Sequence, residues 1–409
     1  MAETYALKAL AADAQAGHAD AMYRLSALLI QMEGEEARAL DWLRKAASAG
    51  HGGARYSLAV LTESGQHLEA KPERAVTLLE TVSAEIPQAR QMLAVMRALG
   101  YSAQAPDWEA AVRLTIEAAG KGDALALRDV GMLLALAGED ASFYLAFLRA
   151  AAEAGDVLSA AQCLHHVLAG FNGLPPSVQQ TYLEQVMAAG HPLAATWQAG
   201  LAAKADVEGL TGTAVVDKAA MVADLLANPD SLSQRIAAAV GRGRTPMAEK
   251  SEAVAGLSAL RGFVPRSLCV HAVGLAHPYM EPTDDAHVFA AKLATARTDL
   301  ALAALSVRVR RSLGYSVLAV PHVYCILPQA AGWPDMGEVG SQASLIARLS
   351  DVPEGLGLMD VTSGLAVDML AGDAVMVHHG GLEQDRLTGL AVDKGLTTAF
   401  WQMGWRALT

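Results

Sequence analysis

The 409-residue chain has few cysteines, few aromatic residues and few charges. Its three cysteines, Cys163, Cys269 and Cys325, form no CxxC pair, which argues against a disulfide framework and against a thiolate zinc site. Aromatic residues make up 5% and charged residues 18%, whereas hydrophobic residues, many of them alanine, make up 53%. This composition excludes a disordered chain and favours closely packed helices, because alanine loses no side-chain entropy in a helix.

Long uncharged apolar runs and an excess of positive charge are also missing. No apolar stretch is long enough to span a bilayer, and the opening MAETYALKALAADAQ lacks the basic start and apolar centre of a secretory signal. We therefore expect a cytoplasmic protein without membrane contact. The net charge of −12 argues against a nucleic-acid partner. The basic run Arg308, Arg310 and Arg311 is predicted to be a solvated helix face, with a local binding patch as the alternative.

A phrase recurs through the first half of the chain. Five copies place a glycine between two amphipathic helices. A sixth, weaker copy has Glu85 at the position of the glycine. Successive steps are 33, 35, 37, 33 and 35 residues between Gly17, Gly50, Glu85, Gly122, Gly155 and Gly190. Glycine ends a helix well because it accepts a left-handed cap conformation. Alanines soon after this slot would let the second helix pack tightly: Ala21, Ala54, Ala89, Ala126 and Ala194. One hairpin cannot bury its apolar face alone, so the pattern predicts a stacked α-solenoid.

The pattern WLRKAASAGH…A…L at 42–58 and its echoes resemble the Sel-one-like repeat, a tetratricopeptide-type helical hairpin. The resemblance covers roughly residues 5–204 and implies a protein- or peptide-binding scaffold. His18, His51 and His191 follow repeat glycines. We interpret them as residues between helices, because a metal site would need them to converge from separate repeats.

Periodicity lapses near residue 204, and the second half has another pattern. Residues 205–257 mix weak helical stretches with glycine and proline and are predicted to be a helical connector, with GRGRTP at 241–246 as an exposed loop. Helices are then predicted within 261–282 and over 299–314. Short strands follow at 322–328, 344–351, 364–370, 373–379 and 395–405. The prediction is a multidomain α plus α+β protein: a solenoid at 1–204, a connector at 205–257 and a β-domain at 258–409.

Three phrases of the second half, in order, resemble the 2-oxoglutarate/Fe(II) dioxygenases of the prolyl 4-hydroxylase-like branch. They are GFVPRSLCVHAVGLAHPYMEP, ASLIARLSDVPEGLGLMDVTSGLAVDMLAGDAVMV (343–377) and DRLTGLAVDKGLTTAFWQMGW (385–405). The resemblance implies a double-stranded β-helix, or jelly roll, with supporting helices. It also implies iron held by two histidines and one carboxylate, and a basic residue that grips the oxoglutarate.

The matched positions do not carry this chemistry. Leu387 stands where the distal metal histidine belongs, and Leu396 where the basic residue belongs. The segment 329–339 contains no histidine, and GLGL at 355–358 replaces the family's GGET turn. An unpaired dicarboxylate in an apolar pocket would cost about 2 kcal/mol or more. We therefore expect no catalytic, metal or cofactor-binding residue in a degenerate domain. Such a domain could form a homo-oligomer or pair with an active relative in a hetero-oligomer.

Two alternatives stay open. In the first, His322, Asp335 and His378 rebuild a site, and an active dioxygenase with Fe(II) and 2-oxoglutarate hydroxylates a peptide that the repeats present. Because adjacent strand residues point to opposite faces, only one of His378 and His379 could face such a site. In the second, the β-domain binds a small ligand in a vestigial pocket without reaction.

Overall fold

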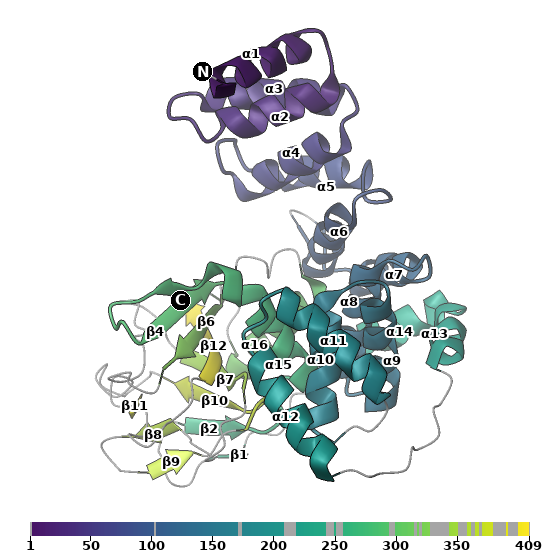
Figure 1. Ribbon diagram of the computed structural model, residues 1–409, viewed down its shortest axis with the longest axis vertical. Helices are drawn as coiled ribbons and strands as arrows, with labels where there is room; N and C mark the ends of the chain where they lie inside the picture. The colour runs from purple at the N-terminus through teal and green to yellow at the C-terminus, as the bar shows by residue number, and fades with distance from the viewer. Residues whose placement is uncertain are drawn as a thin grey trace. The chain divides into compact units, whose positions relative to one another are not determined.

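The computed structural model describes most of the chain (Figure 1). The described residues are 2–101, 104–170, 174–207, 218–242, 249–250, 257–293, 299–314, 317–318, 321–327, 343–350, 358–360, 365–367, 370–378, 390–391 and 400–408. The chain forms two compact units, Met1–Thr115 and Ile116–Thr409. Each unit has a core of its own.

The first unit is a stack of three helical hairpins. They are α1 (Ala2–Gln15) with α2 (Ala19–Leu29), α3 (Glu36–Ser48) with α4 (Gly52–Ser64), and α5 (Pro72–Glu80) with α6 (Pro87–Leu99). Helix α4 packs on both sides, because its Leu58 clusters with Leu43 of α3 while its Ala59 clusters with Leu79 of α5. Each hairpin therefore buries its apolar face against the next, as the repeat predicts.

The repeat glycines end the first helix of their hairpins in the left-handed conformation. Their φ angles are 98°, 91°, 80°, 100° and 69° at Gly17, Gly50, Gly122, Gly155 and Gly190. The next residue donates its N–H to the carbonyl five residues back, as His51 does to Ala46 at 3.0 Å. This is the Schellman motif. The copy with Glu85 differs, since Ile86 N–H bonds to the Val82 carbonyl only four residues back. A side chain with a Cβ would make the left-handed conformation cost about 1–2 kcal/mol there.

After four of the five repeat glycines, the next residue is the N-cap of the second helix: His18, His51, Asp123 and Asp156. The Nδ1 atom of His51 accepts from Ala54 N–H at 3.1 Å, and a carboxylate oxygen of Asp123 accepts from Ala126 N–H at 2.9 Å. The prediction that His51 lies between two helices is confirmed, and the structure adds its capping role. The small residues of the repeat are buried, as predicted: Ala21, Ala54, Ala89, Ala126 and Ala194.

The second unit begins with the remaining hairpins. The unit boundary falls within α7 (Trp108–Ala119), and α8 (Ala124–Ala137) follows in the second unit. There α9 (Ala141–Glu153) pairs with α10 (Val157–Leu168), and α11 (Pro176–Ala188) with α12 (Ala194–Val207). Helices α13 (Lys218–Leu226) and α14 (Pro229–Arg242) pack on α9 and α8. The weak helical stretches predicted in this region form helices, whereas most of the loop predicted at 241–246 lies outside the described residues.

An antiparallel β-domain follows. Its large sheet has nine strands within the described residues, in the order β1-β2-β10-β7-β12-β6-β4-β3, with β5 paired to β12. These strands are β1 (Glu249–Lys250), β2 (Leu257–Leu260), β3 (Glu281–Pro282), β4 (Val288–Lys292), β5 (Val317–Leu318), β6 (His322–Ile326), β7 (Ala343–Arg348), β10 (Ala374–His378) and β12 (Phe400–Leu408).

A small sheet accompanies the large one. It has the order β11-β8-β9, from β11 (Leu390–Ala391), β8 (Leu358–Asp360) and β9 (Leu365–Val367). From β7 onward the chain alternates between the sheets, which is the kind of crossing that a jelly roll makes. The α+β prediction is confirmed, and every predicted strand range contains a strand. The strands additional to the prediction are β1, β2, β3, β4, β5, β8 and β11.

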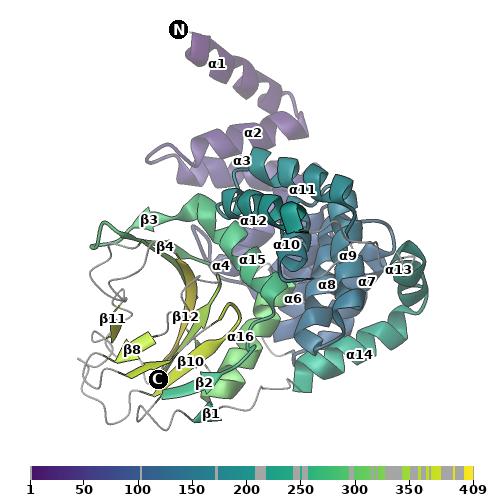
Figure 2. The same ribbon diagram turned by 60° about the horizontal axis from the view of Figure 1, so that its bottom comes forward.

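Two helices lie between the large sheet and the helical hairpins of the second unit (Figures 1 and 2). Helix α15 (Arg266–Ala276), followed by a short 3-10 turn (His277–Tyr279), packs on α10, α8 and β6. Helix α16 (Leu300–Leu313) packs on α8, β5, β7 and β12. The contact is tight, since a Cβ built on Gly274 of α15 would come within 2.5 Å of the Leu158 side chain of α10.

The limits of the compact units differ from the predicted domains. The boundary falls between residues 115 and 116, within α7, and the later hairpins share one unit with the β-domain. The reason is physical: α8 and α10 bury their faces against α15 and α16, so no separate core remains for 116–204. The ranges 1–204, 205–257 and 258–409 stay a prediction about sequence pattern.

Candidate functional site

The strand register separates two residues of the alternative iron site. His322 of β6 pairs with Gly404 of β12, and His378 of β10 pairs with Ala343 of β7. Strands β7 and β12 lie between β10 and β6. Three strand spacings put the two backbones about 14 Å apart across the sheet. Strand register thus separates His322 from His378 within the large sheet, and the alternative site of His322, Asp335 and His378 stays a prediction because Asp335 lies outside the described residues.

The other positions matched to the oxygenase chemistry lie outside the described residues. These are Leu387, Leu396 and the segment 329–339. Within the part of the chain that the structure describes, no group of three His, Cys, Asp or Glu side chains could hold a metal ion. The residues at the matched positions do not fit iron, because a leucine side chain has no donor atom for a metal.

The cysteines are free thiols in sheltered places. Cys163 and Cys269 are buried, and Cys325 is half-buried. Burial raises the pKa of the Cys325 thiol to about 11, so it stays protonated at neutral pH.

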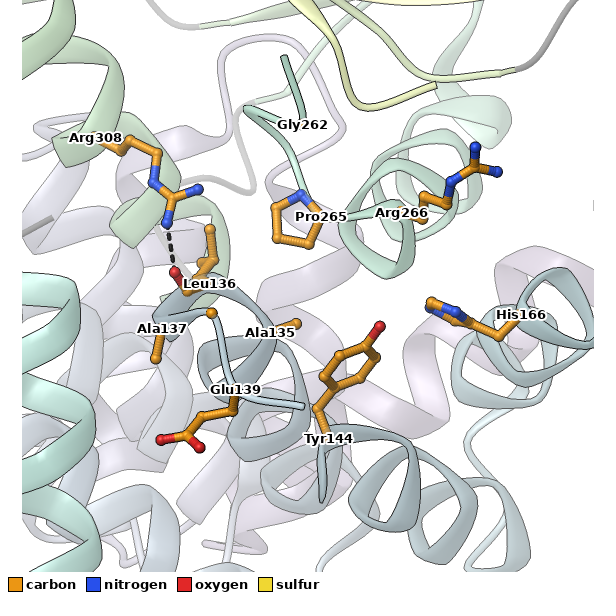
Figure 3. Close-up of a pocket in the computed structure, with 11 residues that line it drawn as sticks. Ala135, Leu136, Ala137, Glu139, Tyr144, His166, Gly262, Pro265, Arg266 and Arg308 are labelled. Carbon is orange, nitrogen blue, oxygen red and sulfur yellow. Dashed lines mark hydrogen bonds between the residues drawn. The ribbon is translucent and has the colours of Figure 1, made fainter. Parts of the chain in front are cut away.

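A cleft of about 350 Å³ opens where the repeats meet the β-domain helices (Figure 3). We call it the junction cleft. It lies beside the C-terminal end of α8, the start of α9 and the first residue of α15. The lining residues are Ala135, Leu136, Ala137, Gly138, Glu139, Tyr144, His166, Gly262, Pro265, Arg266 and Arg308.

Arg308 closes one wall of the junction cleft. Its guanidinium donates to the Phe263 carbonyl at 2.8 Å and to the Leu136 carbonyl at the end of α8. Burial lowers the pKa of Arg308, but its two carbonyl partners keep the charge satisfied. The prediction of a solvated face is therefore wrong for Arg308, whereas Arg311 is exposed. Helix α16 packs on α8, and Arg308 donates to a carbonyl of α8.

His166 and Tyr144 face each other across the cleft (Figure 3). Their ring centroids are 5.4 Å apart. Burial, together with His165 and Arg266, lowers the pKa of His166 to about 4, so the imidazole is neutral at pH 7. Burial and Asp140 raise the pKa of Tyr144, whereas Arg266 opposes that rise. Arg266 thus acts electrostatically on both groups.

The cleft carries a positive balance of charge. Two guanidiniums line it, those of Arg266 and Arg308. Its one lining carboxylate is Glu139, which forms an ion pair with Arg235 of α14 at 3.1 Å. The arrangement offers hydrogen-bond donors and positive potential to an anion. Of these residues the sequence singled out only Arg308. Tyr144, His166 and Arg266 come from three separate helices, and no motif spacing links them.

Buried polar side chains of α8, α10, α15 and α16 form a network, which we call the junction network. A guanidinium nitrogen of Arg128 on α8 donates to Asp156 at 2.9 Å, and a second lies 3.6 Å from Asp129. His271 of α15 donates from Nε2 to Asp299, the N-cap of α16, at 2.6 Å. Burial alone would raise the pKa of Asp299, but His271 and Arg128 lower it to about 2.

The junction network ties the repeats to the β-domain. Asp156 caps α10 by accepting from Ser159 N–H, and Asp299 caps α16 by accepting from Leu302 N–H. Gln162 of α10 adds a direct link, because its side-chain amide donates to the Ser267 carbonyl of α15 at 3.1 Å. Buried polar groups bonded in this way fix the register of α15 and α16 on the repeats.

Comparisons with known proteins give structural likenesses only. No protein-family model matches the sequence, and no curated protein matches it. Among solved structures the chain is similar to a protective antigen of uropathogenic Escherichia coli strains that displays an SLR fold. The TM-score is 0.39 and the identity 23%, over 58% of this chain and 50% of the antigen. The chain thus spans half the length of that antigen.

Two further structures are similar to parts of the chain. A Sel1 repeat protein from Oxalobacter formigenes has a TM-score of 0.37 and 19% identity, over 44% of this chain and 76% of its own. The viral collagen prolyl hydroxylase of Paramecium Bursaria Chlorella virus-1, in a 2OG complex, has a TM-score of 0.29 and 14% identity, over 38% of this chain and 97% of its own. Both kinds of protein named by the sequence resemblances are therefore among the structures similar to this chain.

None of the helices in the described ranges is long and apolar enough to cross a bilayer.

Proposed function

We propose that the protein is a protein- or peptide-binding scaffold whose C-terminal domain has the prolyl 4-hydroxylase-like fold without its catalysis. The observation that carries the proposal is the pair of leucines, Leu387 and Leu396, within an otherwise recognisable closing phrase. Iron needs nitrogen or oxygen donors, and a dicarboxylate needs a cation in an apolar pocket. The two positions offer neither.

The helical repeats support the binding half of the proposal. Helical hairpins in phase with the repeat occur in both units, and stacked hairpins are what repeat proteins of this kind use to hold partners. The alternation of the chain between a large and a small sheet supports the double-stranded β-helix. In this proposal the β-domain serves as a docking or dimerising module, alone or beside an active relative. The expected cytoplasmic location stays a prediction.

Metal analysis of the purified full-length chain tests the catalytic half. We expect no stoichiometric iron after isolation without chelators and no consumption of 2-oxoglutarate when Fe(II) is supplied. Retained iron together with oxoglutarate turnover would overturn the proposal. In that case His322→Ala and His378→Ala would show whether the atypical ligands are responsible, because both variants should then lose turnover while keeping their fold.

The binding half needs an independent measurement. A pull-down with the full chain, followed by identification of bound proteins, should recover a partner in fixed stoichiometry. Size-exclusion chromatography with light scattering then distinguishes a homo-oligomer from a hetero-oligomer. A chain that stays monomeric and recovers no partner at any tested concentration would contradict the scaffold role.

A further inference from the structure

A buried nitrogen in the junction cleft has no partner within the described part of the chain. It is Nε2 of His166, a residue that is only 7% exposed and lines the cleft. An unpaired buried polar atom costs about 1–3 kcal/mol, so folded proteins seldom keep one without a reason. Figure 3 shows the His166 ring and the Tyr144 hydroxyl turned toward one shared space. The geometry therefore suits a partner supplied from outside the chain.

The charges around this space select the kind of partner. Arg266 acts electrostatically on both His166 and Tyr144, and Arg308 forms the far wall. The lining carboxylate, Glu139, is already paired with Arg235 at 3.1 Å. A negatively charged group is thus favoured, whereas a cation would meet two guanidiniums.

The rest of the lining limits the size and polarity of the ligand. A volume of about 350 Å³ is at the lower end of the range that small-molecule sites have. The walls beside the polar groups are the aliphatic side chains of Ala135, Ala137 and Pro265. We propose that the junction cleft binds the carboxylate of a small organic ligand, with Arg266 and the Tyr144 hydroxyl as donors and His166 as a third polar contact.

Two sources of such a carboxylate share this chemistry. One is a free small acid, and the other is the C-terminal carboxylate of a peptide. The second would rest on the proposed peptide-binding function and deepen it. The first would stand even if the scaffold role failed. Neither depends on iron, so the outcome of the metal analysis leaves this inference intact.

Isothermal titration calorimetry on the purified full-length chain tests the inference. The probes are succinate, acetyl-alanyl-alanine with a free carboxyl terminus, the corresponding C-terminal amide and inorganic phosphate. We expect at least one of the two carboxylates to bind and the amide to show no heat of binding. Preference for succinate would assign a free acid, and preference for the peptide acid would assign a chain terminus. Absence of binding by both acids, or tighter binding of phosphate, would overturn the carboxylate assignment.

Variants place the binding in the cleft. Arg266→Gln removes a charged donor and should weaken binding by about 10-fold or more, because charge-assisted hydrogen bonds are the strong ones. Tyr144→Phe removes one neutral donor and should weaken binding by about 3- to 10-fold. Arg311→Gln is the matched control, since Arg311 is exposed and does not line the cleft. Equal effects of Arg266→Gln and Arg311→Gln would refute the site, provided that circular dichroism shows both variants folded.

Discussion

Replacing Arg128 by methionine tests whether the repeats and the β-domain share one core. Arg128 is 5% exposed, and its guanidinium lies 2.9 Å from Asp156 and 3.6 Å from Asp129. Burial lowers the pKa of Arg128, but Asp156, Asp129 and Asp299 outweigh that effect and raise it. Methionine fills similar space without charge, so Arg128→Met leaves three buried carboxylates with one cation fewer.

The expected cost is large. Removing one partner of a buried ion pair typically costs about 3–5 kcal/mol, because the remaining charge stays buried without compensation. Urea unfolding at pH 7, followed by circular dichroism, measures it. The control is Arg149→Met: Arg149 forms an ion pair with Glu153 at 2.8 Å, but the glutamate side chain is 55% exposed. Such a surface pair is worth about 0–1 kcal/mol.

Two further observations separate charge from packing. In Arg128→Met the pKa values of the orphaned carboxylates in the folded state should rise above those of the unfolded chain. As the pH is lowered, the folded state then binds protons before the unfolded state does, so the stability deficit should shrink. Asp156→Asn in the same background removes an orphaned charge yet keeps a good N-cap for α10, and should recover part of the loss. A deficit no larger than that of Arg149→Met, or one that neither low pH nor Asp156→Asn reduces, would refute the electrostatic account.

Two more predictions concern backbone and pH. Gly122→Ala should lower the free energy of unfolding by about 1–2 kcal/mol, because Gly122 has a φ of +80°. Gly120→Ala, two residues away at an ordinary φ, should be neutral or slightly stabilising in the same denaturation assay, and equal effects would contradict the cap assignment. Burial lowers the pKa of His166 and of His191 from 6.5 to about 4. The unfolded chain therefore binds more protons in this range, and the stability present above pH 6.5 should be lost as the pH falls toward 4. His166→Gln should flatten this dependence in pH-resolved thermal unfolding, and an unchanged slope would count against it.

The sequence alone determined the local features of this protein. The spacing of Gly17, Gly50, Gly122, Gly155 and Gly190 set the hairpins, because a left-handed helix end is a property of one residue and its neighbours. Hydrophobic periodicity located α15 and α16 and the main strands in the same way. The phrase resemblance pointed to an oxygenase-like domain, and Leu387 and Leu396 within it are visible only as sequence.

Tertiary structure alone decided the rest. The boundary inside α7 follows from α8 and α10 packing on α15 and α16, a choice of partners that no local pattern encodes. The sequence pattern predicts that Arg308 is a surface residue, whereas in the structure its guanidinium donates to the Leu136 carbonyl near the end of α8. The junction cleft joins Tyr144, His166 and Arg266 from three helices, and the junction network joins Arg128 to Asp156 across 28 positions. Such contacts depend on long-range burial, where the environment of a charge is set by elements distant in sequence.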